Sequence, residues 1–297
     1  MPVHGFALTS AALALSSLSL LAASPHSAPA AAAPAAPLII GHRGAAGLAP
    51  ENTLEAIDRA DRAGVDWVEV DIQRSKDGVL VVMHDQDLVR TTDVRAVFPH
   101  RSPWKVGDFT MAELGRLRAG ASPQWKKTAY ASARIPTLGQ VLDRLDRNGQ
   151  GLLLEVKWPG NFPGVTGDIL KVLDRKGWLD AHHVDNRLYV ISFLAGALKE
   201  VRARRPDIRL GVCDETPSAG ELASYATFVD VVNPDHRGLT QGYVRKAQAL
   251  KGPHGRPLKV WPWTVNTAGP ARQLRDWHAD GITTDVPDTI GKALTQG

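Results

Sequence analysis

The chain has 297 residues, a formal net charge of +4 and a hydrophobic fraction of 43%, which is enough apolar material for a large core. Its basic residues are scattered rather than clustered, which argues against a nucleic-acid-binding surface. Its one cysteine, Cys213, excludes an intrachain disulfide, and we expect it to be a small buried apolar residue.

The N-terminal segment has the composition of an export signal. The first 42 residues contain no Lys, Arg, Asp or Glu, and residues 6–23 form an apolar and small-residue run followed by Ala, Pro and Ser up to residue 36. Residues 1–36 therefore predict a signal peptide with a flexible spacer, and a secreted or extracytoplasmic protein. An uncleaved membrane anchor is the alternative, because no Lys or Arg precedes the run. Five hydroxyl residues interrupt the run, so we expect no stable membrane insertion after signal removal.

Beyond residue 36, short runs rich in Val, Ile and Leu alternate with amphipathic segments. The predicted strands are residues 38–40, 67–72, 80–84, 152–156, 188–191, 209–213, 229–232, 259–261 and 281–284. The predicted helices are residues 53–63, 138–147, 165–175, 195–204, 243–250 and 271–278. Most strand runs are rich in Val, Ile and Leu and do not alternate strictly with polar residues, as expected for a parallel sheet that is buried on both faces. We predict an α/β fold, a TIM-type (β/α)8 barrel over residues 37–297, with a doubly wound open sheet as the alternative.

The third strand run interrupts the alternation of strands and helices. Residues 72–80 are too few for a helical crossover between parallel strands, and Asp77-Gly78 is typical of a tight turn. This leaves nine strand candidates for eight barrel positions. Residues 87–134, which hold several prolines and aromatics, predict a small insertion after the third strand, on the catalytic rim. Thr137 is the expected N-cap of the helix that follows.

Three carboxylates predict a metal site. Glu69 and Asp71 are two apart on a strand, so their side chains share one face, which in a barrel is the inner one. Like charges held there repel each other and take up protons unless a cation lies between them. Glu155 repeats this pattern with Lys157. An all-oxygen site suits one divalent cation, Ca²⁺ or Mg²⁺. The alternative is an internal ion pair of Glu155 with Lys157 or Arg43.

Two histidines predict proton transfer. His42 and His84 both end apolar runs, and each precedes a charged residue. Histidine titrates near neutrality, so the pair suits transfer of a proton from an attacking hydroxyl and to an alkoxide leaving group. Either histidine could instead be a metal ligand. We expect Asp85 to face away from His84 and therefore not to be a ligand.

Two cations beside these groups point to a phosphodiester. Arg43 and Lys157 would neutralise the two non-bridging phosphate oxygens, and together with a metal they would stabilise the charge of the transition state. Glu51 and Asn52 begin a helix after Pro50. They are expected either to cap that helix or to hydrogen-bond the metal ligands or His42.

These motifs, in this order, resemble the glycerophosphodiester phosphodiesterase family. They are His-Arg-Gly at 42–44, Pro-Glu-Asn-Thr at 50–53, Glu-x-Asp at 69–71, an Asp-Gly turn, His-Asp at 84–85, Leu-Glu-Val-Lys at 154–157, Ile-Ser-Phe at 191–193, Trp-Thr-Val-Asn at 263–266 and Gly-Ile-Thr-Thr-Asp-Val-Pro at 281–287. The resemblance covers residues 38–291 and implies a TIM-type barrel with an insertion after the third strand.

The resemblance also implies roles for individual residues. It implies a divalent metal on Glu69, Asp71 and Glu155, an acid/base pair of His42 and His84, and phosphate contacts from Arg43 and Lys157. Trp263 is similar in position to the family's aromatic residue near the bound alcohol, with core packing as its alternative role. Trp261, two residues earlier, is expected on the same face and could share that role. Asn266 and Asp285 follow the last strand runs, and a turn or cap role is as well supported for Asp285.

The expected reaction is hydrolysis of a small glycerophosphodiester to an alcohol and sn-glycerol 3-phosphate. Either a neighbouring hydroxyl of the substrate attacks phosphorus, giving a cyclic phosphate that water opens, or a water attacks directly. The alternatives are a phospholipase-D-like or phospholipase-C-like enzyme, which calls for an exposed apolar rim or basic membrane patch, and an exported phosphodiesterase of a teichoic-acid-type polymer. A non-catalytic barrel is disfavoured because no histidine or metal carboxylate of the pattern is lost.

Overall fold

The computed structural model describes residues 1–5 and 36–295. Contacts divide the chain into two units, Met1–Pro34 and Ala35–Gly297, and the second unit carries the fold. The apolar run at 6–23, on which the predicted signal peptide depends, lies outside the described residues. Within the described part of the chain, no helix has both the length and the apolar character needed to cross a membrane.

Eight parallel strands form a nearly closed barrel, in the order β8-β7-β6-β5-β4-β2-β1-β9. Their bounds are β1 Leu38–Gly41, β2 Trp67–Arg74, β4 Gly151–Val156, β5 Leu188–Ser192, β6 Arg209–Asp214, β7 Val231–Pro234, β8 Lys259–Val260 and β9 Gly281–Thr284. Backbone bonds bring the last two strands together, since the Asp280 amide donates to the Val260 carbonyl at 3.1 Å and the Thr283 amide donates to Pro262 at 2.9 Å. The predicted TIM-type barrel is confirmed, and the open sheet is wrong.

The ninth strand candidate is a real strand that lies outside the barrel. β3 (Leu80–Val82) pairs antiparallel with the far end of β2, with Arg74 opposite Leu80. The connecting turn is closed by the Gly78 amide, which donates to the Ser75 carbonyl at 3.0 Å, and Gly78 has a φ of +85°, which favours glycine. The predicted tight turn is therefore present. The insertion follows the third strand of the chain but only the second strand of the barrel.

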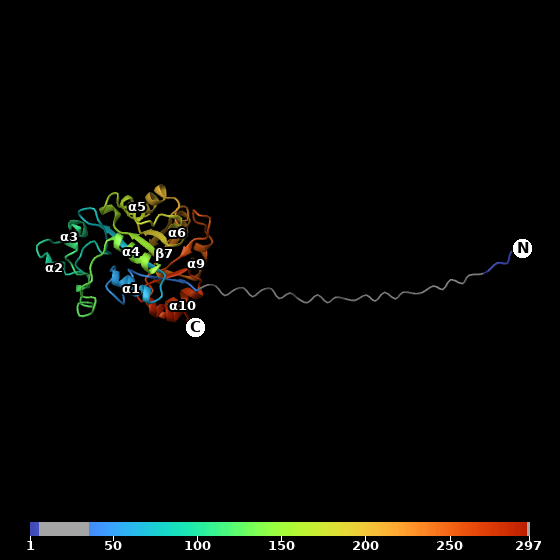
Figure 1. Ribbon diagram of the computed structural model, residues 1–297, viewed down its shortest axis with the longest axis horizontal. Helices are drawn as coiled ribbons and strands as arrows, with labels where there is room; N and C mark the ends of the chain where they lie inside the picture. The colour runs from blue at the N-terminus through green and yellow to red at the C-terminus, as the bar shows by residue number, and fades with distance from the viewer. Residues whose placement is uncertain (6–35, 296–297) are drawn as a thin grey trace. The chain divides into compact units, whose positions relative to one another are not determined.

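Helices surround the barrel strands, as Figure 1 shows for α1, α4, α5, α6, α9 and α10. Their bounds are α1 Leu54–Arg62, α4 Leu138–Asn148, α5 Val165–Arg175, α6 Ala181–Asn186, α7 Ala195–Arg204, α8 Ala219–Tyr225, α9 Gln241–Gln248, α10 Ala268–Asp276 and α11 Pro287–Thr295. All six predicted helices are present. Of these helices, the prediction missed α6, α8 and α11. Thr137 caps α4 as expected, because its side chain accepts a hydrogen bond from the Gln140 amide.

The barrel interior is filled by its own hydrophobic cluster. This cluster contains Ile40, Leu153, Tyr189, Ile191, Cys213, Val231 and Trp261. The Trp261 ring centroid lies 4.7 Å from that of Tyr189 and 6.1 Å from that of Trp67, and these two residues stand near the amino ends of β5 and β2. The expectation that Trp261 could share the role of Trp263 is therefore wrong, because Trp261 fills the opposite end of the barrel. Cys213 is buried, as expected.

Residues 87–134, the insertion, pack around a second hydrophobic cluster. The insertion contains the short helices α2 (Val94–Val97) and α3 (Met111–Leu114), which stand at the left of Figure 1 in green. Phe109 and Leu114 are fully buried and pack in one cluster with Val81 of β3. The β2–β3 hairpin therefore connects the barrel to the insertion through apolar contacts.

Candidate active site

A cavity of about 610 Å³ opens where the barrel strands end at their carboxyl ends. Its lining includes His42 and Arg43 directly after β1, Trp158 after β4, Phe193 after β5 and Trp263 after β8. This is the end of a TIM-type barrel at which enzymes of this fold carry out their chemistry.

The turn after β1 directs His42 and Arg43 into this cavity. Gly44 has a φ of +86°, and a Cβ at this position would lie 2.6 Å from the backbone carbon of Ala56, so only glycine allows α1 to pack this close. The His42 amide donates to the Thr284 carbonyl at 2.8 Å, and the Gly44 amide donates to Glu69 at 3.2 Å. These bonds anchor the turn to the neighbouring strands β9 and β2.

The side chain of His42 is held by a carboxylate on the loop that follows the last strand, β9. Its Nδ1 lies 2.6 Å from Oδ1 of Asp285, and the other carboxylate oxygen accepts from the Asn266 amide group at 2.6 Å. A carboxylate only accepts, so Nδ1 donates this hydrogen bond and Nε2 is the nitrogen left for other partners. Burial raises the pKa of Asp285, but hydrogen bonds from His42 and Asn266 outweigh it, so the pKa lies below its ordinary value. Asp285 therefore positions His42, a role that the sequence did not predict for it.

His84 has a matching partner in Asp85. The His84 Nδ1 lies 2.7 Å from Oδ1 of Asp85, so the expectation that Asp85 faces away is wrong. The alternation of side chains holds only within a strand, and β3 ends at Val82. Beyond it the chain curls around Gln73, whose Nε2 donates to the carbonyls of Met83 at 2.8 Å and Asp85 at 2.6 Å. The two histidines are thus oriented in the same way.

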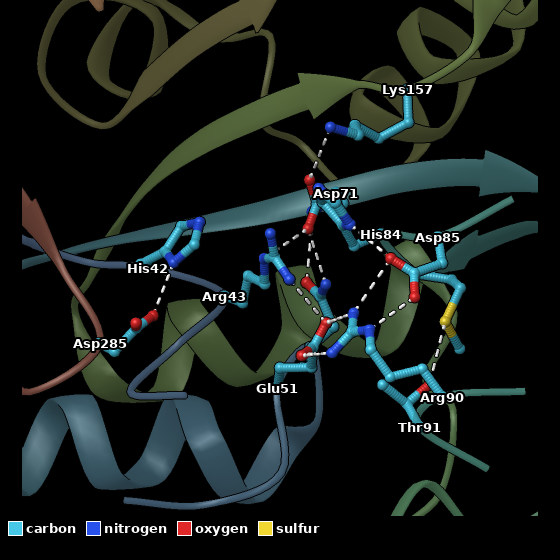
Figure 2. Close-up of polar contacts among 12 residues, drawn as sticks. His42, Arg43, Glu51, Asp71, His84, Asp85, Arg90, Thr91, Lys157 and Asp285 are labelled. Carbon is cyan, nitrogen blue, oxygen red and sulfur yellow. Dashed lines mark hydrogen bonds and ion pairs between the residues drawn. The ribbon is translucent and has the colours of Figure 1, made fainter. Parts of the chain in front are cut away.

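Arg90, which belongs to none of the predicted motifs, joins the Asp85 and Glu51 sides of the site (Figure 2). Its guanidinium donates to Asp85 at 2.6 and 3.0 Å and to Glu51 at 2.5 and 2.8 Å. Glu51 also accepts from Arg43 Nη1 at 2.8 Å. Hydrogen bonds from Arg90 and the charge of Arg43 overcome burial and lower the pKa of Glu51. The insertion thereby supplies one arginine that holds Asp85 and Glu51 together.

We expect Arg90→Ala to lower kcat by about 10-fold to 100-fold, because Asp85 and Glu51 would lose the donor that orients them. Arg118→Ala is the matched control, since Arg118 is an insertion arginine that is 54% exposed, against 50% for Arg90, and pairs with Asp93 at 2.8 Å. Steady-state kinetics of both variants check this. Equal losses in the two variants would mean that Arg90 only supports the insertion.

Three carboxylates come together in the barrel wall, as the sequence predicts. β2 pairs with β4 so that Asp71 stands opposite Glu155, and Glu69 lies two residues earlier on β2. One oxygen from each of these buried side chains lies within 4.8 Å of the others. We call Glu69, Asp71 and Glu155 the carboxylate cluster.

The charges of the carboxylate cluster favour a bound cation. Burial and the charges of the other two carboxylates raise the pKa of Glu69 well above its ordinary value, and burial together with Asp71 raises the pKa of Glu155 to about 7. Burial also acts on Asp71, but the charges of Arg43, His84 and Lys157 overcome it and lower that pKa. Oε1 of Glu69 is buried and accepts no hydrogen bond. A free carboxylate oxygen in an all-oxygen cluster fits a hard divalent cation such as Ca²⁺ or Mg²⁺.

Lys157, Arg43 and Asn52 surround this cluster. Lys157 Nζ lies 2.8 Å from Glu155 Oε1 and 3.8 Å from Asp71 Oδ1, so the alternative ion pair is present within the cluster. Arg43 Nε lies 3.5 Å from Asp71 Oδ2. The Asn52 side chain donates to Asp71 Oδ2 at 2.8 Å, which is the expected support of a metal ligand. The cap of α1 is Thr53 instead.

Trp263 lies in the cavity wall, where its Nε1 donates to the Asn233 carbonyl at 2.6 Å. Its ring meets that of Phe193 edge to face, with centroids 5.6 Å apart. Trp263 is half-buried and lines the cavity rather than the core, so its contact with a bound alcohol stays a prediction.

We expect the metal-free protein to lose stability as the pH rises from about 4.5 to about 7. Below its ordinary pKa of 4.5 the Glu155 carboxyl is protonated in both the folded and the unfolded chain. Above that pH the Glu155 carboxyl ionises first in the unfolded chain, which favours unfolding. The loss of stability is complete once the pH exceeds about 7, the pKa of Glu155 in the folded protein. The expected loss is on the order of 1–3 kcal/mol.

Thermal unfolding in EDTA across this pH range checks the expectation. Glu155→Gln should flatten the profile, because an amide does not titrate. Added Ca²⁺ or Mg²⁺ should stabilise the wild-type protein most at the upper end of the range, where the carboxylates are ionised. A melting temperature that is constant over the range, with and without metal, would contradict the expectation.

Comparisons with known proteins agree with this geometry. The glycerophosphoryl diester phosphodiesterase family matches residues 42–289. A glycerophosphodiester phosphodiesterase of Bacillus subtilis is 31% identical over 265 residues, which cover 86% of this chain and 85% of the relative. One of Caldanaerobacter subterraneus is 28% identical over 270 residues, which cover 88% of this chain and 98% of the relative.

A solved structure extends the likeness to three dimensions. The Oleispira antarctica phosphodiesterase in complex with the product sn-glycerol-3-phosphate is 30% identical, with a TM-score of 0.74. The match covers 88% of this chain and 98% of that chain. Sequence and fold agree over most of the chain, which belongs to the glycerophosphoryl diester phosphodiesterase family.

Proposed function

We propose that the protein hydrolyses a glycerophosphodiester to an alcohol and sn-glycerol 3-phosphate, with His42 and His84 as its acid/base pair. The observation that carries this proposal is the presence, on one cavity, of two histidines whose Nδ1 atoms are each bound to a carboxylate. Each imidazole therefore has Nε2 left for the substrate. The product bound to the Oleispira antarctica relative supports the choice of sn-glycerol 3-phosphate.

The carboxylate cluster would hold one divalent cation, Ca²⁺ or Mg²⁺. When bound, such a cation neutralises charge on the phosphate and polarises its oxygens. Arg43 and Lys157 bind the non-bridging oxygens, and their own contacts with Asp71 and Glu155 keep both side chains in place. One histidine accepts the proton of the attacking hydroxyl, and the other gives a proton to the leaving alkoxide.

The two histidines are oriented alike, so both routes of attack remain compatible with the site. In one route a neighbouring hydroxyl of the substrate attacks and a cyclic phosphate forms, which water then opens. In the other a water attacks directly. Phosphorus NMR of early products distinguishes them, because a transient cyclic phosphate excludes direct attack by water as the only path.

A panel of glycerophosphodiesters with different head groups tests the proposed reaction. We expect release of sn-glycerol 3-phosphate from glycerophosphocholine and glycerophosphoethanolamine, loss of activity in EDTA, and its recovery with Ca²⁺ or Mg²⁺. Release of a phosphorylated head group would indicate phospholipase-C-like cleavage instead. Full activity in EDTA would contradict the metal proposal.

We also propose an extracytoplasmic location, supported by the apolar and small-residue composition of residues 1–36. N-terminal sequencing of the exported protein tests it. Recovery of the whole chain in the cytoplasm would contradict it.

A further inference from the structure

Three large apolar side chains are exposed together at the mouth of the active-site cavity. Within residues 36–295, exposed large hydrophobic side chains are confined to Trp158, Phe193 and Leu194, at 40%, 45% and 51%. All three line the cavity. We call them the apolar rim. Single exposed apolar residues are common on protein surfaces, but their concentration at the entrance of one cavity marks a binding surface.

Contacts with the site hold the apolar rim in place. The Trp158 indole Nε1 donates to the His84 carbonyl at 3.1 Å. The Phe193 ring packs edge to face on Trp263, and the Leu194 amide donates to Ser192 Oγ at 3.1 Å. The rim is therefore an ordered part of the cavity, adjacent to the groups proposed to act on phosphate.

The cavity is larger and more apolar than a fully deacylated diester requires. Its volume of about 610 Å³ lies within the range of pockets that hold ligands of drug size. Beyond the histidines and the carboxylate cluster, its wall continues through Leu153, Val156 and Ile191 to the apolar rim. A diester without acyl chains carries hydroxyls, phosphate and a polar head group along its length, so it offers this wall no apolar partner.

Charge argues against a cationic head group on the rim. Lys157 Nζ already lies 5.8 Å from the ring centroid of Trp158 and 5.3 Å from that of Phe193. The aromatic faces that could attract a quaternary ammonium are therefore next to a resident positive charge, which repels a second one. An uncharged hydrocarbon chain meets no such repulsion.

We propose that the apolar rim binds a hydrocarbon chain of the substrate, so that the preferred substrate is a glycerophosphodiester that retains one acyl chain. This inference rests on the proposed function, since the same bond between phosphorus and the head-group oxygen breaks. Water supplies the hydroxyl that phosphorus gains and the proton that the head-group alcohol gains. The products are an acylglycerol 3-phosphate and the free alcohol.

The test compares kcat/KM of the full chain on glycerophosphocholine with that on 1-acyl-glycerophosphocholines of increasing chain length, all below their micelle concentrations. Each buried methylene favours binding several-fold, so we expect a gain of about tenfold or more between about six and ten acyl carbons. Phe193→Ser and Leu194→Ser should each flatten this dependence. Leu179→Ser, at a half-buried leucine before α6, is the matched control that should keep it.

Each result has one meaning. Hydrolysis of glycerophosphocholine without any gain from the acyl chain would overturn this inference and leave the proposed function intact. No hydrolysis of any diester would overturn the proposed function itself. A gain in kcat/KM that appears only above the micelle concentration would indicate binding of a lipid surface. It would also overturn the inference that the cavity holds the acyl chain.

Discussion

Replacing His42 with alanine is expected to lower kcat by about 10²-fold to 10⁴-fold, the usual contribution of a positioned acid or base. Its Nδ1 is held by Asp285 at 2.6 Å, and its Nε2 is left for the substrate. KM should change much less, because the proposed phosphate contacts come from Arg43 and Lys157. Steady-state kinetics on a soluble glycerophosphodiester, with circular dichroism to confirm the fold, provide the measurement.

Asp285→Asn tests whether the carboxylate partner of His42 matters for the reaction. An amide can present its NH₂ group to Nδ1 and so favour the wrong tautomer of His42, and we expect a loss of about 10-fold to 100-fold in kcat. Asp288→Asn serves as the control, because Asp288 lies in the first turn of α11, close to Asp285 in sequence, but accepts a hydrogen bond from the Thr289 amide instead of contacting His42. A folded His42→Ala protein with wild-type kcat would refute the catalytic assignment.

Replacing Asp71 with asparagine is expected to abolish metal binding and to lower activity by about a thousandfold, because a bound cation contributes several kcal/mol to the transition state. Asp71 is the member of the carboxylate cluster whose pKa is lowered. Burial acts to raise this pKa, but the charges of Arg43, His84 and Lys157 outweigh burial. It is therefore the member that stays ionised and attracts the cation.

The binding measurement is separate from activity. Titration calorimetry and the thermal shift on adding Ca²⁺ or Mg²⁺ should both show binding to the wild-type protein and none to Asp71→Asn. Asp77→Asn, on the β2–β3 turn, is the matched control, since this aspartate bonds Ser75 and stands outside the carboxylate cluster. If Asp71→Asn keeps the wild-type thermal shift, the carboxylate cluster is not the metal site.

Most of the barrel could be predicted because its strands are buried on both faces. Runs such as that of β4 are rich in Leu and Val and are buried along their whole length, which is a strong local signal. No local pattern shows that β3 pairs outside the barrel, because Leu80–Val82 is as buried as a barrel strand. α8 was missed because it buries little apolar surface, with Leu222 as its buried residue.

The candidate site shows the same division between local and distant signals. Glu69 and Asp71 share a face because a strand repeats every two residues, and this rule works within β2. It failed for Asp85, which lies beyond the end of β3. The partnership of His42 with Asp285 joins residues 243 positions apart, and no spacing rule reaches that far. The bonds of Arg90 depend on how the insertion folds back on the barrel.

The pairing of β1 with β9 has a consequence for the timing of activity during synthesis. Gly41 stands opposite Thr284, so the residue after each strand, His42 and Asp285, meets only when the first and last strands lie side by side. A ribosome must therefore release nearly the whole chain before His42 acquires its carboxylate. A nascent or C-terminally truncated chain has the carboxylate cluster and both His42 and His84 but lacks this pair, and the recovery of activity on refolding reports closure of the barrel.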